Sequence, residues 1–253
     1  MRKALALLSL LVYPAALAQV NLTISPARVE LFLAPGEPFA FPVVVQNGLP
    51  REEPLTVRLA PFRVREDGSV EIREEPSPGG GLCPALQIRP TAFTVPPSGK
   101  VEVRVEGWAP GANEGQGTLA CLVVFTAQPR PGRQGGIQVS LRPEVGLALY
   151  VTLRGTEKAS LRAGVGGEGE ALPVVLENPG NVLQRVNGEA LVLNGEGKEV
   201  ARLRLEEVPV WPGGRRKLLL EPKSPLPPGR YRVVLVLESA YGRYAAEGVW
   251  AVP

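Results

Sequence analysis

Residues 136–153, GIQVSLRPEVGLALYVTL, carry apolar side chains at every second position. Each odd position from Ile137 to Leu153 is apolar, and at Pro143 the chain lacks a main-chain N–H donor. A period of two residues is that of a β-strand with one apolar face, whereas a helix repeats every 3.6 residues. The stretch therefore predicts a long strand, and Pro143 favours an edge position or a bulge within it.

The rest of the chain repeats this pattern in shorter runs. Runs rich in Val, Leu, Ile and Thr recur about every ten residues, and Pro and Gly residues separate them. Helical periodicity is nearly absent beyond residue 18, so we predict an all-β protein. The first series of expected strands covers residues 21–33, 39–46, 55–64, 69–73, 85–95, 100–107, 118–126 and 136–153. Strands of this number and spacing are typical of an immunoglobulin-like β-sandwich.

A second series of strands follows a break in the pattern. Charged residues and five glycines interrupt the alternation at residues 154–169. Beyond them, expected strands cover residues 171–177, 188–193, 199–205, 215–220, 229–238 and 243–252. We therefore predict two immunoglobulin-like β-sandwich domains in tandem, with the first at residues 19–155, a linker at 156–169 and the second at 170–253.

The N-terminus has the three parts of a secretory signal peptide. Arg2 and Lys3 give a positive start, residues 4–12 an apolar core, and Ala16-Leu17-Ala18 a cleavage motif of small residues. We expect residues 1–18 to be removed on export to the periplasm or cell envelope. No other stretch approaches the roughly 18 apolar residues that a membrane helix needs, so no stable membrane insertion is expected.

The amino-acid composition excludes several classes of function. The sequence contains no histidine, which excludes Ser-His-Asp and Cys-His catalysis and every histidine metal site. Without Arg2 and Lys3 the net charge of +3 falls to +1, so charge gives no reason to expect nucleic-acid binding. We expect no cofactor and no metal.

The two cysteines, Cys83 and Cys121, form one even pair. In an oxidising compartment such a pair favours a disulfide over a metal site, which needs more ligands than two thiols. Closing a loop of this length restricts the unfolded chain by about 4 kcal/mol in the loop-entropy model. The alternative is a pair of unrelated buried thiols.

Several segments of the first half resemble one known family. They are SPARVEL at residues 25–31, PGE at 35–37, VVVQN at 43–47, LQIRP at 86–90 and FTVPPSGKVEVRV at 93–105. In this order they are similar to the first domain of the periplasmic pilus chaperones of the usher pathway. The resemblance covers residues 21–153 and extends more loosely over the second domain. It implies a protein that binds an exported pilus-like or surface subunit without catalysis.

The resemblance also implies a mode of binding. The family donates an edge strand to an incomplete partner sandwich, and alternate apolar side chains fill the groove of the partner. The residues expected to do this here are Ile137, Val139, Leu141, Val145, Leu147, Leu149 and Val151. The alternative is an ordinary sandwich strand whose apolar side faces its own core. Residues 127–135, which precede the strand, correspond to the variable loop before the donor strand of the family and are expected to be flexible.

The family holds the terminal carboxylate of its subunit with an Arg near the start of the first strand and a Lys on the long final strand. Arg28 matches the Arg, whereas residues 144–147 contain no Lys. Arg142 is a possible substitute. A guanidinium suits this role because it binds a carboxylate through two parallel hydrogen bonds. The alternative for Arg28 is an ion pair at the surface or between the domains, with Glu30 as a partner.

A second resemblance competes with the first. Residues 136–155, the turn NPGN at 178–181 and residues 226–231 are similar to WxL-interacting surface proteins and related envelope proteins with tandem immunoglobulin-like domains. That resemblance implies a structural cell-envelope protein that binds cell-wall polymer or a surface protein. Both families bind partners, so we expect no enzymatic activity.

Tryptophans and charged clusters give weaker signals. We expect Trp108, Trp211 and Trp250 to pack in turns or cores rather than to form a sugar-stacking platform. The basic run Arg215-Arg216-Lys217 is either a contact for an anionic ligand or a solvated strand start, and the pair Glu66-Asp67 is expected in a solvated loop.

Overall fold

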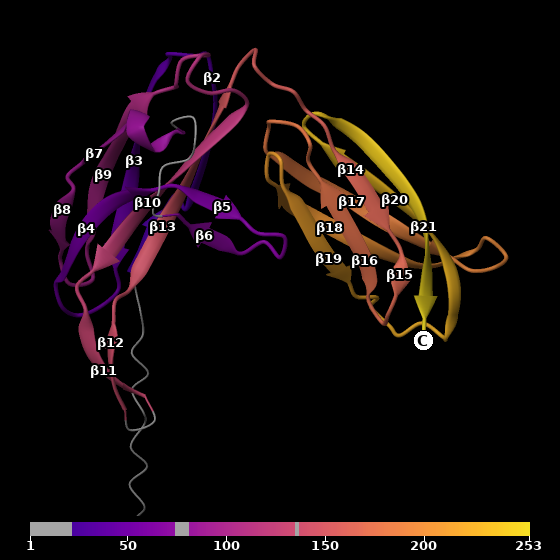
Figure 1. Cartoon of the computed structure of the whole chain (residues 1–253). Coiled ribbons are helices and arrows are strands. Elements are labelled where there is room, and N and C mark those ends of the chain that lie inside the picture. The colour runs from indigo at the N-terminus through magenta and orange to yellow at the C-terminus, as the bar shows by residue number, and fades with distance from the viewer. Residues whose placement is uncertain (1–21, 74–80, 135–136) are drawn as a thin grey trace, which may run out of the picture.

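The computed structural model describes residues 22–73, 81–134 and 137–253, and it consists of two β-sandwiches in tandem (Figure 1). The predicted all-β class and the immunoglobulin-like sandwich architecture are confirmed. The predicted signal peptide, residues 1–18, lies outside the described residues. The part of the chain that the structure describes contains no helix long and apolar enough to cross a membrane.

The first domain packs two sheets face to face. In spatial order, the four-stranded sheet contains β1 (Leu22–Ser25), β3 (Pro38–Asn47), β9 (Lys100–Trp108) and β7 (Leu86–Arg89). The five-stranded sheet contains β2 (Arg28–Leu33), β13 (Glu144–Leu153), β10 (Thr118–Ala127), β4 (Glu53–Ala60) and β8 (Ala92–Val95). All neighbours are antiparallel except β2 and β13, which run parallel.

Four of the long strands expected from the sequence are divided at a proline, and one of them is 55–64, which Pro61 divides into β4 and the short strand β5 (Phe62–Val64). The expected strand 21–33 breaks at Pro26 into β1 and β2, which belong to different sheets. Pro90 divides 85–95 into β7 and β8 in the same way, and Pro143 separates β13 from β12 (Ile137–Leu141). Proline has no N–H to give to a ladder, so a strand can leave its sheet at that residue.

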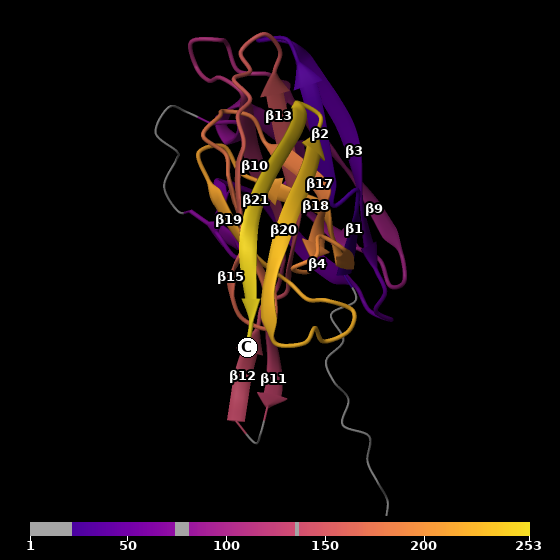
Figure 2. The same cartoon turned by 90° about the vertical axis from the view of Figure 1, so that its right-hand side faces the viewer.

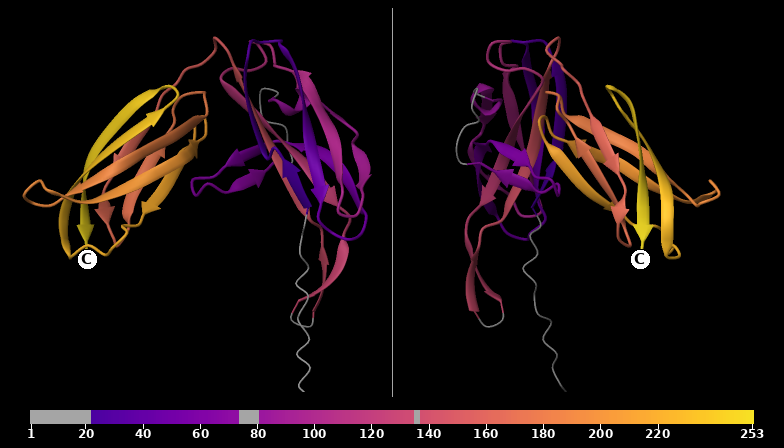
Figure 3. Two further views of the ribbon diagram at one scale, coloured as in Figure 1. Left: turned by 180° about the vertical axis from the view of Figure 1, so that it is seen from behind. Right: turned by 45° about the vertical axis from the view of Figure 1, so that its right-hand side comes forward.

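Two hairpins project from the first domain. Residues 130–134 were expected in a flexible loop but form β11 (Arg130–Gln134), which pairs with β12 in a ribbon at the lower end of the domain (Figure 2). Glu53, buried at the start of β4, forms an ion pair with Arg130 and holds the base of this ribbon. The second hairpin, β5 (Phe62–Val64) with β6 (Val70–Ile72), extends toward the second domain (Figure 3).

The core of the first domain is closed by a disulfide. Cys83 lies in the short 3-10 helix η1 (Cys83–Ala85), and Cys121 lies on β10. The two residues are bonded with their Cα atoms 5.1 Å apart, so the predicted disulfide is confirmed. Apolar side chains of both sheets surround it, with Val103, Val105 and Phe125 among those that are fully buried.

The second domain also packs two sheets. The three-stranded sheet contains β14 (Arg162–Val165), β16 (Leu172–Glu177) and β19 (Arg215–Leu220). The five-stranded sheet contains β15 (Gly167–Glu168), β21 (Gly242–Val252), β20 (Gly229–Ser239), β17 (Gln184–Leu193) and β18 (Glu199–Val210). Trp250 is fully buried between the sheets, and the hydroxyl of Tyr231 donates to the carbonyl of Pro227 at 2.8 Å. This bond four residues upstream is that of a tyrosine corner.

The expected linker, residues 156–169, contributes strands to the second domain. Within it, β14 pairs with β16 and β15 pairs with β21, so the chain changes sheet between Val165 and Gly167. Gly166 and Gly167 have φ of +111° and +141°, which side-chain-bearing residues rarely adopt. The glycines that suggested a linker in the sequence instead permit the change of sheet.

Candidate functional site

The candidate site lies where the outer face of the five-stranded sheet of the first domain meets the second domain. Three aromatic rings form the apolar part of this contact. The ring of Phe62 on β5 lies 6.0 Å from that of Tyr150 on β13 and 5.5 Å from that of Trp211, which follows β18. Leu183 of the second domain packs on the same cluster. Phe62, Tyr150 and Leu183 are buried, so the two domains share a small apolar core.

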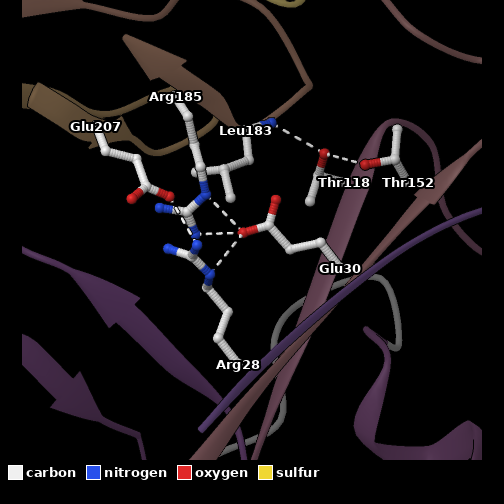
Figure 4. Close-up of polar contacts among 7 residues, drawn as sticks. All are labelled: Arg28, Glu30, Thr118, Thr152, Leu183, Arg185 and Glu207. Carbon is white, nitrogen blue, oxygen red and sulfur yellow. Dashed lines mark hydrogen bonds and ion pairs between the residues drawn. The ribbon is translucent and has the colours of Figure 1, made fainter. Parts of the chain in front are cut away.

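Beside the aromatic cluster, four charged side chains join the two domains (Figure 4). Nη2 of Arg28 on β2 lies 2.7 Å from Oε1 of Glu207 on β18. Nε of Arg185 on β17 lies 2.5 Å from Oε1 of Glu30, and Nε of Arg28 lies 3.4 Å from the same oxygen. We call Arg28, Glu30, Arg185 and Glu207 the interdomain ion cluster. Two guanidinium groups thus converge on carboxylates that the protein itself supplies.

The two ion pairs between the domains differ in solvent exposure. The side chain of Arg185 is 19% exposed, and its guanidinium carbon lies 5.7 Å from the centre of the Tyr150 ring. The side chains of Arg28 and Glu207 are 47% and 53% exposed. Burial raises the pKa of the Tyr150 phenol, which stays protonated beneath Arg185 at neutral pH. Arg185 is therefore fixed against the first domain, whereas the pair Arg28–Glu207 faces solvent.

Glu207 has an unusual backbone conformation. Its φ is +50°, in the left-handed region that costs a residue with a side chain about 1 to 3 kcal/mol. The pairing of β17 with β18 shifts register between Val186 and Gly188, opposite this part of β18. The side chain of Asn187 in that irregularity accepts a hydrogen bond from the N–H of Glu207 at 2.8 Å. The bulge thus holds Glu207 in a conformation that directs its carboxylate to Arg28.

A second polar contact fixes the domains close to the linker. Oγ1 of Thr118 accepts a hydrogen bond from the N–H of Leu183 at 2.9 Å and lies 2.8 Å from Oγ1 of Thr152 (Figure 4). The N–H of Thr118 donates to the carbonyl of Asn181 at 2.8 Å. Gly117, with φ of +68°, lies so close to Asn181 that a Cβ atom would overlap that carbonyl. This contact therefore requires a glycine at position 117.

The β5–β6 hairpin makes a third contact. At its tip, the carbonyl of Glu66 accepts a hydrogen bond from the N–H of Lys217 on β19 at 2.9 Å, and the two side chains form an ion pair. The hydrogen bond from Lys217 lowers the pKa of Glu66 below its usual value. The guanidinium of Arg216 lies against Gly68. The acidic loop and the basic run that looked like separate solvated features in the sequence therefore bind each other.

The edge of β13 is open over its first residues. β2 pairs with β13 only from Ala148, which lies opposite Arg28. The N–H of Ala148 donates to the carbonyl of Ala27, so even-numbered residues of β13 direct their main-chain groups to the β2 side. Among the described residues, no strand pairs with the N–H and C=O groups of Glu144 and Gly146 on that side. This gap ends where β2 begins, at Arg28.

The structure divides the residues expected to bind a partner into two groups. Leu147, Leu149 and Val151 are fully buried in the core of the first domain, because odd-numbered positions of β13 face the opposing sheet. Their side chains are therefore not available to a partner in this structure. Leu141 is 42% exposed at the end of β12, and Val145 is half-buried at the start of β13. The backbones of Ile137 and Val139 belong to β12, and their side chains lie outside the described residues.

Sequence reasoning found Arg28 but missed Arg185, Glu207 and Tyr150. Arg28 forms ion pairs with Glu207 of the second domain and with Glu30, which corresponds to the alternative expected for it. Tyr150 occupies an even position of an odd-numbered apolar series, which is the one sequence signal that marks it as facing outward. Arg142, the suggested second cation, is exposed before β13, and no ion pair of the described residues involves it. Among the described residues, no group of three or more Cys, Asp or Glu is arranged to hold a metal ion.

No protein-family model matches the sequence, and no curated protein matches it. Solved structures do match the fold. A chain in the structure of a chaperone–tip adhesin complex of CFA/I fimbriae biogenesis is similar with a TM-score of 0.51 and 12% identity, over 90% of this chain and 98% of that chain. The class 5 fimbriae chaperone CfaA is similar with a TM-score of 0.50 and 12% identity, over 91% of this chain and 99% of that one. The chain thus has the two-domain fold of these fimbrial chaperone structures.

Proposed function

We propose that this protein is a non-enzymatic chaperone or adaptor that binds an exported, pilus-like or surface protein subunit in the periplasm or cell envelope. The proposal is supported by the fold, which matches a fimbrial chaperone along almost the whole of both chains. It is supported most by the open edge of β13 at Glu144–Leu147, because unpaired main-chain groups at a sheet edge can take up a strand of a partner.

The binding surface in this proposal is shorter than the sequence suggested. It runs along the edge of β12 and the first residues of β13, and Leu141 offers an exposed apolar side chain beside it, whereas Val145 is half-buried against the core. The β11–β12 ribbon, anchored through Glu53 and Arg130, extends this edge beyond the domain (Figure 1). Pro143 interrupts the ladder once, between the two strands.

We propose that the partner strand runs parallel to β13, as β2 does. A strand that lies parallel to β13 along Glu144–Leu147 continues the position of β2 backwards, and its C-terminal end reaches the start of β2. That end is Arg28. A terminal carboxylate of the partner would then lie beside Arg28, and Arg185 of the second domain supplies the second cation that the sequence lacks near residue 144.

Two proline variants test the edge. The partner is first isolated by its stoichiometric co-purification with the exported protein. Gly146→Pro removes an N–H on the open side of β13, so it should weaken the complex and leave the protein folded. Val145→Pro removes an N–H on the β10 side and should destabilise the domain instead. A Gly146→Pro variant that binds the subunit with unchanged affinity would contradict the proposal.

A second candidate function has one observation in its favour. Trp108, at the end of β9, is 55% exposed on the outer face of the four-stranded sheet, where Gln87, Arg89 and Glu106 lie near it in a shallow groove. An exposed indole beside planar polar groups suits a saccharide, so binding of cell-wall polymer is the alternative. Sedimentation of the protein with isolated cell wall, abolished by Trp108→Ala, would support it over the chaperone.

A further inference from the structure

Of the charges that face Arg28, only Glu207 comes from the other domain and is itself accessible to solvent. The groups around Arg28 are Glu30 on its own strand, and Arg185 and Glu207 on the second domain. Glu30 is already bound to Arg185, whose guanidinium stacks on Tyr150. Glu207 has only Arg28 as a charged partner among the described residues. An exchange of carboxylates at this cluster would therefore replace Glu207.

We infer that Glu207 is an internal substitute for the carboxylate of a partner: it occupies Arg28 in the free protein and is displaced when the partner binds. This inference rests on the proposed function and adds a means of regulating the same site. It requires Glu207 to be held near Arg28 weakly enough to leave. Exposed ion pairs of this kind contribute little to stability, because water and salt screen both charges.

The backbone of Glu207 agrees with this role. A residue with a side chain at φ of +50° is uncommon, and such conformations concentrate at binding and switch regions. At this position the bulge and the hydrogen bond that the N–H of Glu207 donates to Oδ1 of Asn187 set the direction of the carboxylate. The neighbouring Glu206 lies in the same bulge without a positive φ, is exposed, and forms no ion pair among the described residues. The chain thus has two adjacent glutamates, of which only one is directed to Arg28.

Displacement of Glu207 does not require the domains to separate. Three other contacts still join the domains when Arg28 exchanges its partner. They are the ion pair Arg185–Glu30, the aromatic cluster around Tyr150 and the contact of Thr118 with Leu183. The partner therefore meets a fixed interdomain contact in which one carboxylate has to be replaced. The energy for the exchange comes from the terminal carboxylate, which arrives on a strand that is already paired with β13.

The test uses short synthetic peptides of alternating Val and Thr, with either a free C-terminal carboxylate or a C-terminal amide. Their affinities for the full exported protein are measured by titration calorimetry. Glu207→Gln removes the competing charge, so we expect it to bind the carboxylate peptide more tightly than the unmodified protein does, by up to about fivefold, the upper end of the range for an exposed ion pair. Its affinity for the amide peptide should not change. Glu206→Gln is the matched control and should alter neither affinity.

A second variant covers the case in which Glu207→Gln does not fold. Glu207→Asn is uncharged and has a side chain that tolerates the left-handed region, so it should show the same gain. If both variants bind the carboxylate peptide no better than the unmodified protein, the inference is wrong while the proposed function stands. If neither peptide binds to the unmodified protein or to any variant, the proposed function fails and the inference fails with it.

Discussion

Arg28 of the first domain and Glu207 of the second are 179 residues apart in sequence and 2.7 Å apart between Nη2 and Oε1. Arg28 lies at the point where β2 begins to pair with β13, and Glu207 lies in a bulge of β18. The end of the open sheet edge and the contact between the domains therefore coincide. In the proposed complex, a partner strand along that edge would end at the interdomain ion cluster.

The first prediction concerns Arg28. Arg28→Ala should lower the yield of the complex with the exported subunit and abolish the preference for a carboxylate over an amide peptide, because the guanidinium is the cation nearest the end of the open edge. Its melting temperature should change little, since the lost ion pairs are exposed. Calorimetry and thermal unfolding measure the two effects. Unchanged peptide preference would remove Arg28 from the site.

The second prediction separates the exposed residues from the buried ones. Leu141→Arg should leave the protein folded and weaken the binding of the subunit, because Leu141 is exposed on β12. Leu149→Arg should unfold the first domain, because a charge without a partner would be buried in its core. Circular dichroism and co-purification distinguish the two outcomes. A folded Leu149→Arg variant would show that the apolar face of β13 is accessible.

The third prediction concerns the disulfide. Replacing both Cys83 and Cys121 with Ser should lower the free energy of unfolding by about 2 to 5 kcal/mol, as is typical for a native disulfide of a small exported domain. Denaturant unfolding of the exported protein measures the loss. Intact mass after alkylation under non-reducing conditions is the control, and two labelled cysteines would show that the bond does not form.

The fourth prediction is a pH dependence of the β5–β6 hairpin. Hydrogen bonds from Arg65 and Arg63 lower the pKa of Glu71 from 4.5 to about 2, and Lys217 lowers that of Glu66. A lowered carboxyl pKa contributes stability above the unfolded value that is lost as pH falls through the folded value. The hairpin should therefore loosen between about pH 4.5 and pH 2 as Glu71 loses its hydrogen bonds with Arg63 and Arg65. Its contact with Lys217 should weaken as Glu66 is protonated. Fluorescence of Trp211, which packs on Phe62, reports the change, and a flat signal over this range would argue against it.

The fifth prediction tests the polar contact near the linker. Gly117→Ala places a Cβ against the carbonyl of Asn181 and forces alanine into a left-handed backbone, so it should loosen the contact between the domains. Each domain keeps its own core and should remain folded. Small-angle X-ray scattering should show a larger radius of gyration. Gly36→Ala, at a positive φ in an open turn of the first domain, is the control that should leave the radius unchanged.

The sequence predicted well those features that depend on local pattern. Alternation gave the strands of both sandwiches, and the compartment argument gave the bond between Cys83 and Cys121. The positions of the prolines were not used to predict where a strand leaves its sheet. The chain changes sheet at Pro26 and at Pro90, but the alternation of apolar residues continues across both prolines and does not reveal the change. Alternation reports which face of a strand is apolar, but not which sheet the strand joins.

The site was only partly predictable because its residues come together through tertiary contacts. Arg28 was identified from a local motif, whereas Arg185 and Glu207 lie on strands of the other domain. The ion pair between Glu66 and Lys217 could not be predicted either, because each residue lies in a charged segment of a kind that is ordinarily solvated. For Leu147 and Leu149 the sequence left two placements open, because an apolar face that suits a partner also suits a core, and both side chains are buried in the core of the first domain.

The central claim is that a partner strand pairs with the open edge of β13, and residue-specific amide hydrogen exchange tests it most directly. In the complex with the co-purified subunit, the amides of Glu144 and Gly146 should become protected, because they face the open side. The amides of Val145 and Leu147, which face β10, should be protected with and without the partner. Binding that leaves Glu144 and Gly146 in rapid exchange, with new protection at another edge such as β8 or β18, would contradict the claim.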